Sequence, residues 1–216
     1  MDRLLFLECS PVGRDSLGAK LVLAALRQCN ALGHEIQVTT RSLTEEPLAP
    51  LSAQYARAVV SSAPPDDPAV ALSERLIGEL DACDRLLIST PMHNFTVPAS
   101  LKLWIDYVLR NGRSFASTPD GKVGLLRDRP ALVLVRSGSA CVGDAARQPD
   151  FLTPYLRHAL SVVGIRKLRF AYLPGRFPSD EALARTGRAL TSFLAPSLPA
   201  ETFHEHASPA LSNALA

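Results

Sequence analysis

The chain has 216 residues, 47% of them hydrophobic, which is enough apolar material to fill the core of one domain. Its formal net charge is only +2 and it has no long basic block, so a nucleic-acid-binding surface is not expected. Its apolar stretches are shorter than a membrane span, and a signal peptide is not expected. We therefore expect one cytoplasmic domain, residues 1–196, followed by a disordered tail, residues 197–216.

The four cysteines stand at positions 9, 29, 83 and 141 and form no CxxC pair and no spaced cluster with histidines. Neither a disulfide framework nor a metal site is expected, and reduced structural thiols are the simpler interpretation. The pair His204 and His206 in the polar tail is too isolated to indicate a metal site.

The first half of the chain alternates short apolar runs with amphipathic stretches. Residues 4–9, LLFLEC, are typical of a buried strand that ends at a turn, and residues 16–32 place most of their apolar side chains on one helical face. Residues 35–40, EIQVTT, predict a second strand. A Pro-rich and Ala-rich segment follows, with a short helix predicted at 51–62 and another helix at 69–80.

The second half repeats this alternation. Its predicted strands are 85–90, 131–137 and 168–173, and its predicted helices begin at 98, span 152–163 and span 179–194. Near-continuous Leu, Ile and Val runs have no solvent-facing side, so five such strands alternating with helices predict a parallel sheet covered on both faces. The predicted fold class is a three-layer, doubly wound α/β sandwich.

In such a sheet, ligands bind outside the carboxyl ends of the strands, where the strand order reverses. Three loops are placed there: 10–18, 91–97 and 136–143. The first, SPVGRDSLG, puts serines and backbone amides at the start of a helix, where an anion is favoured. It matches neither GxGxxG nor GxxxxGK[ST], so a Rossmann dinucleotide site and a P-loop are disfavoured. In the simpler interpretation, Ser16 is an ordinary helix cap.

The second and third loops suit a flat heteroaromatic ligand. In the second, Met92 and Phe95 offer polarisable and stacking surface, and Asn94 can donate and accept hydrogen bonds. The third, RSGSACVG, is small and flexible enough for close approach of the backbone to a ligand, and Gly138 permits unusual dihedral angles. Each loop alone also suits a purely structural role. A phosphate at the first loop and a planar ring between the others match the layout that flavin mononucleotide (FMN) requires.

Several motifs together resemble those of the FMN-dependent NADH-azoreductases, also called NADH:quinone oxidoreductases, which have a flavodoxin-like fold. The most specific is PMHNFTVPASLKLWIDYVLRNGRSF at 91–115, followed by DGKVGLL at 120–126 and DFLTPYLRHALSVVGI at 150–165. The resemblance spans residues 4–195. It implies a five-stranded sheet of order 2-1-3-4-5, an FMN cofactor, NADH or NADPH as hydride donor, and a homodimer with active sites at the interface.

The resemblance also implies which residues bind FMN. The residues that correspond to the phosphate site are Ser10, Ser16, Leu17 and Gly18. Those that correspond to the ring-binding loop are Met92, His93, Asn94 and Phe95, and those of the third flavin loop are Arg136, Ser137, Gly138 and Ser139. The family usually has S-x-S in the first loop, so Gly18 lacks one hydroxyl, and the phosphate is expected to rely on backbone amides or on Arg14. The usual S-R-G-G of the third loop is RSGS here, which leaves its register open by one residue.

The resemblance implies a ping-pong cycle, in which NADH reduces the flavin and a quinone or azo compound then takes two electrons in the same pocket. The cofactor carries the chemistry, so no catalytic residue is assigned, and His93 is an optional proton donor. The alternative is a flavodoxin-type FMN electron carrier that docks to partner proteins, although such carriers use a strongly acidic face. A flavin-free hydrolase on the same fold is disfavoured because no nucleophile with a base is evident.

Overall fold

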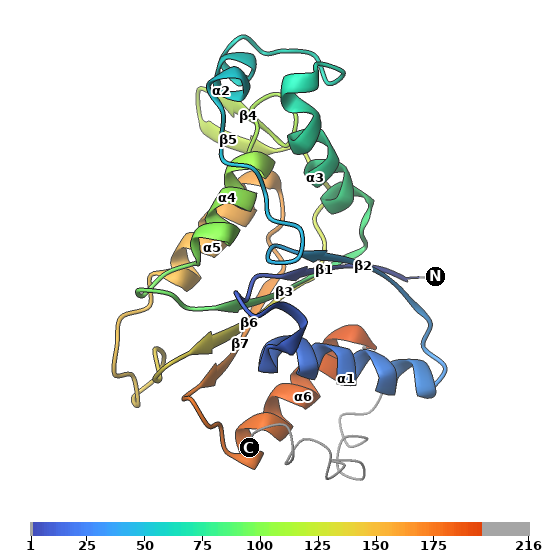
Figure 1. Ribbon diagram of the computed structural model, residues 1–216, viewed down its shortest axis with the longest axis vertical. Helices are drawn as coiled ribbons and strands as arrows, with labels where there is room; N and C mark the ends of the chain where they lie inside the picture. The colour runs from blue at the N-terminus through green and yellow to red at the C-terminus, as the bar shows by residue number, and fades with distance from the viewer. Residues whose placement is uncertain (1, 196–216) are drawn as a thin grey trace.

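The computed structural model describes residues 2–195, and its centre is a parallel β-sheet of five strands (Figure 1). The strands are β1 (Asp2–Glu8), β2 (Ile36–Ser42), β3 (Arg85–Pro91), β6 (Ala131–Ser137) and β7 (Leu168–Pro174). Their order is β2-β1-β3-β6-β7, and every neighbouring pair is parallel. With these five strands counted in chain order, this is the order 2-1-3-4-5, which confirms the predicted fold class.

Helices cover both faces of the sheet. On one face lie α1 (Leu17–Ala31) and α6 (Asp180–Leu194), and on the other lie α3 (Ala71–Ala82), α4 (Ala99–Val108) and α5 (Leu152–Val163) (Figure 1). Two separate hydrophobic clusters result, because successive strand residues point to opposite faces. In β1, Leu4 and Phe6 belong to the α1 and α6 cluster, whereas Leu5 and Leu7 belong to the cluster on the other side.

The central strands hold the polar strand ends in fixed positions. Residues 86–88 of β3 and 133–135 of β6 have 0% exposure, and burying each large aliphatic side chain is worth about 1.5–3 kcal/mol. The register pairs Glu8 with Ser89 and Pro91 with Arg136. The loops that follow β1, β3 and β6 therefore begin beside one another at one edge of the sheet.

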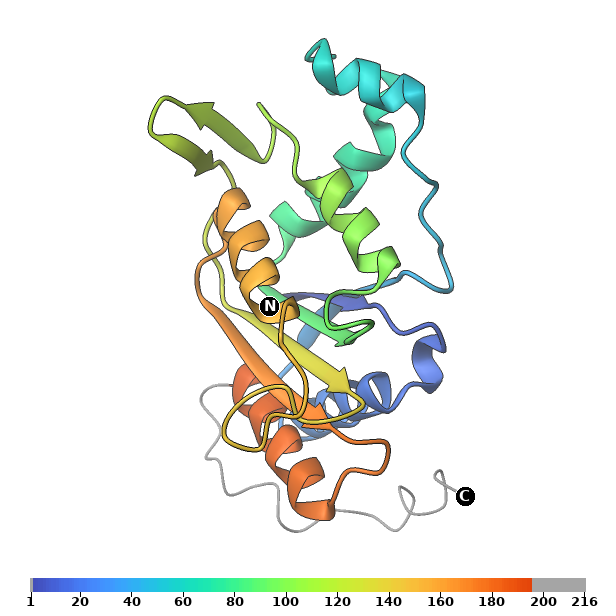
Figure 2. The same ribbon diagram turned by 90° about the vertical axis from the view of Figure 1, so that its left-hand side faces the viewer.

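An antiparallel hairpin lies outside the sheet, and no sequence pattern predicted it. Its strands are β4 (Phe115–Thr118) and β5 (Gly121–Gly124), and it lies at the same end of the molecule as α2 (Ala53–Val60) (Figure 2). Most of its side chains are exposed, so it lacks an alternating apolar pattern. The hairpin docks closely on α5, because a Cβ at Gly124 would overlap the backbone of Gly164 at the end of that helix.

The start of α4 differs from the prediction. The helix begins at Ala99, and Pro98 is its N-cap residue rather than part of its first turn. No side chain caps this helix. The predicted tail, 197–216, lies outside the described residues. Within residues 2–195, no helix is both long and apolar enough to cross a membrane.

Candidate functional site

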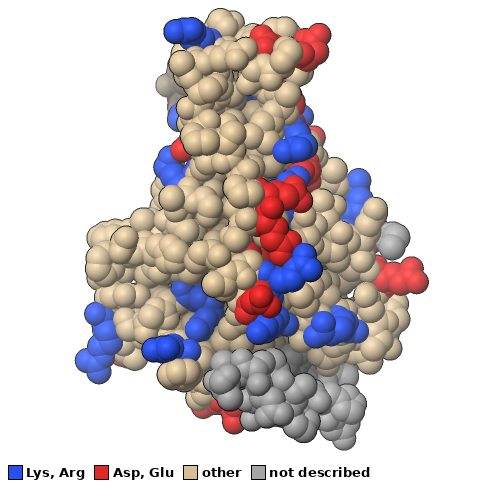
Figure 3. Space-filling view, in the orientation of Figure 1, with Lys and Arg blue, Asp and Glu red and all other residues tan. Residues whose placement is uncertain are grey.

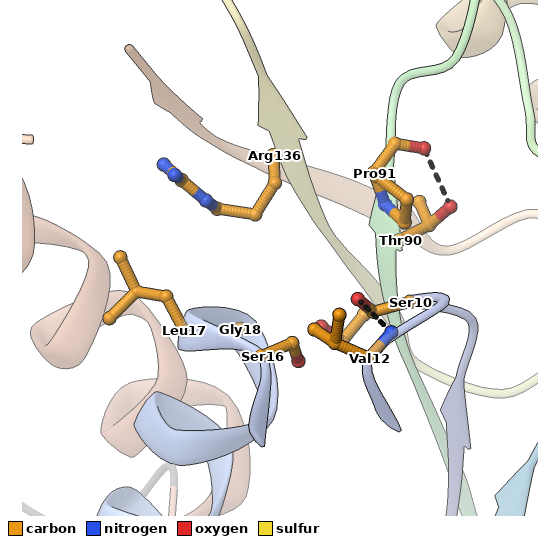
Figure 4. Close-up of a pocket in the computed structure, with 9 residues that line it drawn as sticks. Ser10, Val12, Ser16, Leu17, Gly18, Thr90, Pro91 and Arg136 are labelled. Atoms are coloured by element: carbon orange, nitrogen blue, oxygen red, sulfur yellow. Dashed lines mark hydrogen bonds between the residues drawn. The ribbon is translucent and has the colours of Figure 1, made fainter. Parts of the chain in front are cut away.

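A cavity of about 190 Å³ opens at the carboxyl edge of the sheet, next to the start of α1 (Figure 4). Its walls come from the first loop, the first turn of α1 and the ends of β3 and β6. The lining residues are Ser10, Val12, Ser16, Leu17, Gly18, Ser89, Thr90, Pro91 and Arg136. The cavity therefore brings together all the residues assigned to the phosphate and one residue of the third loop, Arg136.

The start of α1 offers hydrogen-bond donors at this cavity. Ser16 is the N-cap, and its Oγ accepts from the amide of Ala19 at 3.0 Å. The amide of Lys20 donates to the carbonyl of Ser16, where the helical ladder begins. The amides of Leu17 and Gly18 precede that ladder and have no intrahelical acceptor. Together with the positive end of the helix dipole, they favour an anion at this position.

Glu8 lies beneath the first loop and is 1% exposed. Its Oε1 accepts from the amide of Ser10 at 2.9 Å and from the hydroxyl of Ser16 at 3.3 Å, whereas its Oε2 has no partner among residues 2–195. Burial raises the pKa of this carboxyl, and the charge of Glu45 adds to the rise, while the two hydrogen bonds oppose it. Sequence reasoning missed Glu8, because an acidic residue at a strand end ordinarily faces solvent.

Arg136 supplies the positive charge of the cavity. Its side chain extends from β6 toward the side where Leu17 lies (Figure 4). The guanidinium donates to the carbonyls of Leu173 at 2.6 Å and Gly175 at 3.1 Å, which fix its direction. It forms no ion pair within the described part of the chain. Burial lowers the pKa of Arg136, but a guanidinium stays protonated at neutral pH.

Arg14, the other expected phosphate contact, lies elsewhere. It lies within a short 3-10 helix, Gly13–Asp15, that precedes α1, and it does not line the cavity. Its guanidinium is exposed and pairs with Glu45 through two contacts of 2.7 and 2.8 Å. Of the two arginines, Arg136 therefore lines the cavity beside Gly18, and Arg14 does not.

The second loop turns sharply between His93 and Thr96. Two backbone hydrogen bonds of 2.9 and 3.0 Å join these residues, and the intervening Asn94 and Phe95 have φ angles of +46° and +72°. Asparagine tolerates positive φ better than most residues, whereas for phenylalanine it costs roughly 1–2 kcal/mol, so the strain of this turn lies mainly at Phe95. Phe95 is 46% exposed. The turn follows the cavity wall in sequence, but its residues do not line the cavity.

The third loop packs partly against itself. Ser137 is buried, and its hydroxyl donates to the carbonyl of Ser139 at 2.7 Å. Gly138 does not adopt a positive φ, and the positive φ in this segment belongs to Gly143 at +71°. Apart from Gly138 itself and its two chain neighbours, no residue that the structure describes has a heavy atom within 4 Å of the position that a Cβ of Gly138 would take. The backbone at Gly138 is therefore open to close approach by a ligand.

Gln148 links the second and third loops, and sequence reasoning missed it. Its side-chain amide lies 3.4 Å from the sulfur of Met92 and 3.4 Å from the carbonyl oxygen of Ser139. The backbone amide of Met92 also donates to the carbonyl of Arg136 at 2.6 Å. These bonds hold the two loops together. A lone glutamine in a polar loop has no sequence pattern that would have indicated this contact.

Comparison with known proteins decides the family. Residues 2–194 match the model of a family described as having a flavodoxin-like fold. A relative from Burkholderia lata, named FMN-dependent NADH:quinone oxidoreductase 5, is 57% identical over 85% of this chain and 90% of its own length. The chain belongs to the FMN-dependent NADH:quinone oxidoreductase family. A second member of that family, from Pseudomonas fluorescens, is 50% identical over 86% of this chain and 90% of its own length.

Solved structures share the fold of this NADH:quinone oxidoreductase family member. An FMN-dependent NADH-azoreductase from Bacillus anthracis, in complex with FMN, has a TM-score of 0.73 over 90% of this chain and 99% of its own. An azoreductase named AzrA has a TM-score of 0.75 over the same shares. At 19% and 22% identity, these likenesses establish the fold alone. The assignment of individual residues rests on the geometry of this chain.

Proposed function

We propose that the protein is an FMN-dependent oxidoreductase that transfers two electrons from NADH or NADPH to quinones and aromatic azo compounds. The names of its relatives support FMN, NADH and a quinone acceptor. The motif resemblance implies the azo acceptor. The geometry of the cavity supports a phosphate-bearing cofactor.

The observation that carries the proposal is the cation of Arg136 beside the start of α1. A partly buried guanidinium without an acidic partner favours an anion as its counter-ion. A cavity of about 190 Å³ suits a phosphate group with part of its chain, and not a whole flavin. The FMN phosphate would occupy this cavity, which leaves the ring outside it, over the strained turn of the second loop.

Residues of the second and third loops would then hold the ring. Met92 and Phe95 supply polarisable and aromatic surface, and Asn94 supplies an amide. Bound FMN supplies the hydride chemistry that no side chain of the site provides. The chain would fix the phosphate, hold the ring against the second and third loops and offer backbone amides that stabilise negative charge developing on the reduced ring. His93 is exposed and able to give a proton to the acceptor.

In this proposal the nicotinamide and the acceptor use the same open face in turn, in a ping-pong order. Steady-state kinetics with NADH and NADPH against quinones, nitroaromatics and azo dyes test it. We expect turnover with at least one nucleotide and parallel double-reciprocal lines. Bound flavin that neither nucleotide reduces would overturn the assignment as an oxidoreductase.

Potentiometric titration separates this enzyme from a flavodoxin-type electron carrier. A reductase of this kind is expected to take up two electrons in one step. Two well-separated one-electron steps would favour the carrier. The net charge of +2 argues against a carrier, because the chain has no excess of acidic residues for a docking face. The cytoplasmic location and the domain limit at residue 196 stay predictions.

We also propose that two copies of the chain pair on the ring side of the site. Large apolar side chains are exposed on the second and third loops and just beyond them, with Phe95 at 46%, Val142 at 39% and Phe151 at 59%. The surface over α4 shows few charged side chains in Figure 3, whereas acidic and basic side chains alternate beside it. Such apolar surface is typical of an interface. Light scattering should give twice the chain mass, and a fully active monomer would contradict a shared site.

A further inference from the structure

Ser89 is a residue of the cavity that the sequence did not indicate. It lies near the end of β3, is 2% exposed and lines the cavity. Its hydroxyl forms no hydrogen bond with any residue that the structure describes. The hydroxyl is not among the fully buried polar atoms without a partner, so it faces the cavity itself. This position therefore offers a free hydrogen-bond donor to an occupant of the cavity.

The Ser89 side chain leaves room only for a glycine at position 18. A Cβ at position 18 would overlap the Oγ of Ser89 and lie 3.7 Å from its Cβ. Gly18 has no positive φ, so glycine is not needed there for the backbone conformation. Glycine within a helix is unfavourable by about 0.5–1 kcal/mol relative to alanine, and the glycine makes room for the Ser89 hydroxyl. The hydroxyl from β3 therefore stands where a side chain on α1 would otherwise stand.

We propose that Ser89 donates a hydrogen bond to the phosphate of the bound flavin nucleotide and replaces the hydroxyl that Gly18 lacks. A phosphate monoester offers only acceptors to a neutral hydroxyl, which matches a serine with a free proton. The same cavity holds the cation of Arg136 and the first turn of α1. The donor set therefore draws on three separate elements, β3, β6 and α1. This inference rests on the proposed FMN function.

A purely steric role for the pair Ser89 and Gly18 makes a different prediction. If Ser89 only fills space, Ser89→Ala should leave the affinity for FMN unchanged, because the methyl group keeps most of the volume. If its hydroxyl binds the phosphate, Ser89→Ala should weaken FMN by about tenfold, the equivalent of about 1.4 kcal/mol for a hydrogen bond to a charged group. Riboflavin, which has no phosphate, should bind both proteins equally.

Moving the hydroxyl back to the helix gives a second, independent test. Gly18→Ser alone should weaken FMN, because the new side chain overlaps Ser89. The double variant Gly18→Ser with Ser89→Ala removes the overlap and returns one hydroxyl to the cavity, so it should bind FMN more tightly than either single variant. Thr90→Val is a matched control, since the hydroxyl of Thr90 already donates to the carbonyl of Pro91 at 3.0 Å and should matter less.

The measurement is fluorescence titration of the full chain with FMN and riboflavin, with thermal unfolding to confirm that each variant folds. A loss in Ser89→Ala that is specific to FMN, together with recovery in the double variant, supports the proposal. Unchanged FMN affinity in Ser89→Ala, or equal losses for FMN and riboflavin, overturns it while the FMN function stands. If the wild-type chain binds FMN no better than riboflavin, the phosphate site itself is wrong and this inference falls with it.

Discussion

The phosphate half and the ring half of the proposed FMN site are adjacent but are built in different ways. The phosphate half consists of strand ends and the first turn of α1, and Ser16, Gly18 and Ser89 are all buried there. The ring half is an exposed turn that holds Asn94 and Phe95 at positive φ. Packing thus preorganises the first half, whereas backbone strain and bonds between loops shape the second.

This difference predicts two kinds of sensitivity. Binding of the phosphate should depend on individual charged and polar side chains, because their positions are already fixed by burial. Binding of the ring should depend on the shape of the turn, because its side chains are exposed. Comparing FMN with riboflavin separates the two halves, since the ring is common to both ligands and the phosphate is not.

Arg136→Ala is expected to have the largest effect. FMN should bind about 10-fold to 100-fold more weakly, because hydrogen bonds to charged groups contribute about 1.5–3 kcal/mol. Riboflavin should lose little affinity. Fluorescence titration with both flavins measures the split, and Arg14→Ala, which breaks only an exposed pair with Glu45, is the control. Equal losses for the two flavins would remove Arg136 from the phosphate half.

Asn94→Ala tests the ring half and should weaken FMN and riboflavin alike, by roughly 5-fold to 30-fold. Holding alanine at positive φ costs about 1–2 kcal/mol, and asparagine tolerates this conformation better. Alanine also lacks the amide group. His93→Ala should lose much less, because His93 holds its place in the turn through its backbone. Asn94→Gly keeps the turn and removes only the amide, so it separates the two causes. Small losses in both Asn94 variants would mean that this loop has only a structural role.

The phosphate half was partly predictable from sequence, because local patterns mark it. Ser10 and Ser16 lie between a strongly apolar strand and an amphipathic helix. This pattern involves only neighbouring residues, so it can be recognised from the sequence. Ser89 and Glu8 could not be predicted in the same way. Their side chains meet the first loop because β1 and β3 pair in parallel with Glu8 opposite Ser89, and this register is a long-range property.

The ring half and the hairpin β4–β5 were less predictable for related reasons. The positive φ of Phe95 follows from closure of the turn by His93 and Thr96, and propensity alone disfavours such a conformation for phenylalanine. The hairpin is defined by its contact with the end of α5, where Gly124 meets the backbone of Gly164. Exposed polar strands carry no periodic apolar signal that would reveal them.

Glu8 allows a finer test of the boundary between the two halves. Its folded pKa is raised by burial, so its contribution to stability is fully present below the usual value of 4.5 and is lost as pH rises through the folded pKa. Over the same range, the ionising carboxylate should also weaken FMN, because it lies beside the phosphate half with Oε2 unpartnered. Thermal unfolding and FMN titration across this pH range measure both losses. Glu45→Gln is the control for the smaller effect of its charge.

Glu8→Gln should abolish these pH-dependent losses and is expected to have the smallest effect of the three. Its side-chain carbonyl can still accept hydrogen bonds from Ser10 and Ser16, and it carries no negative charge. Near neutral pH the free energy of FMN binding should therefore be more favourable by about 1 kcal/mol, which is roughly fivefold in affinity. The FMN phosphate takes up its own proton near pH 6, roughly, but this contribution is common to both proteins and cancels. Riboflavin should show no such gain, because it engages the ring half alone. A matching pH step for riboflavin would mean that the charge of Glu8 also reaches the ring, and that the two halves do not act separately.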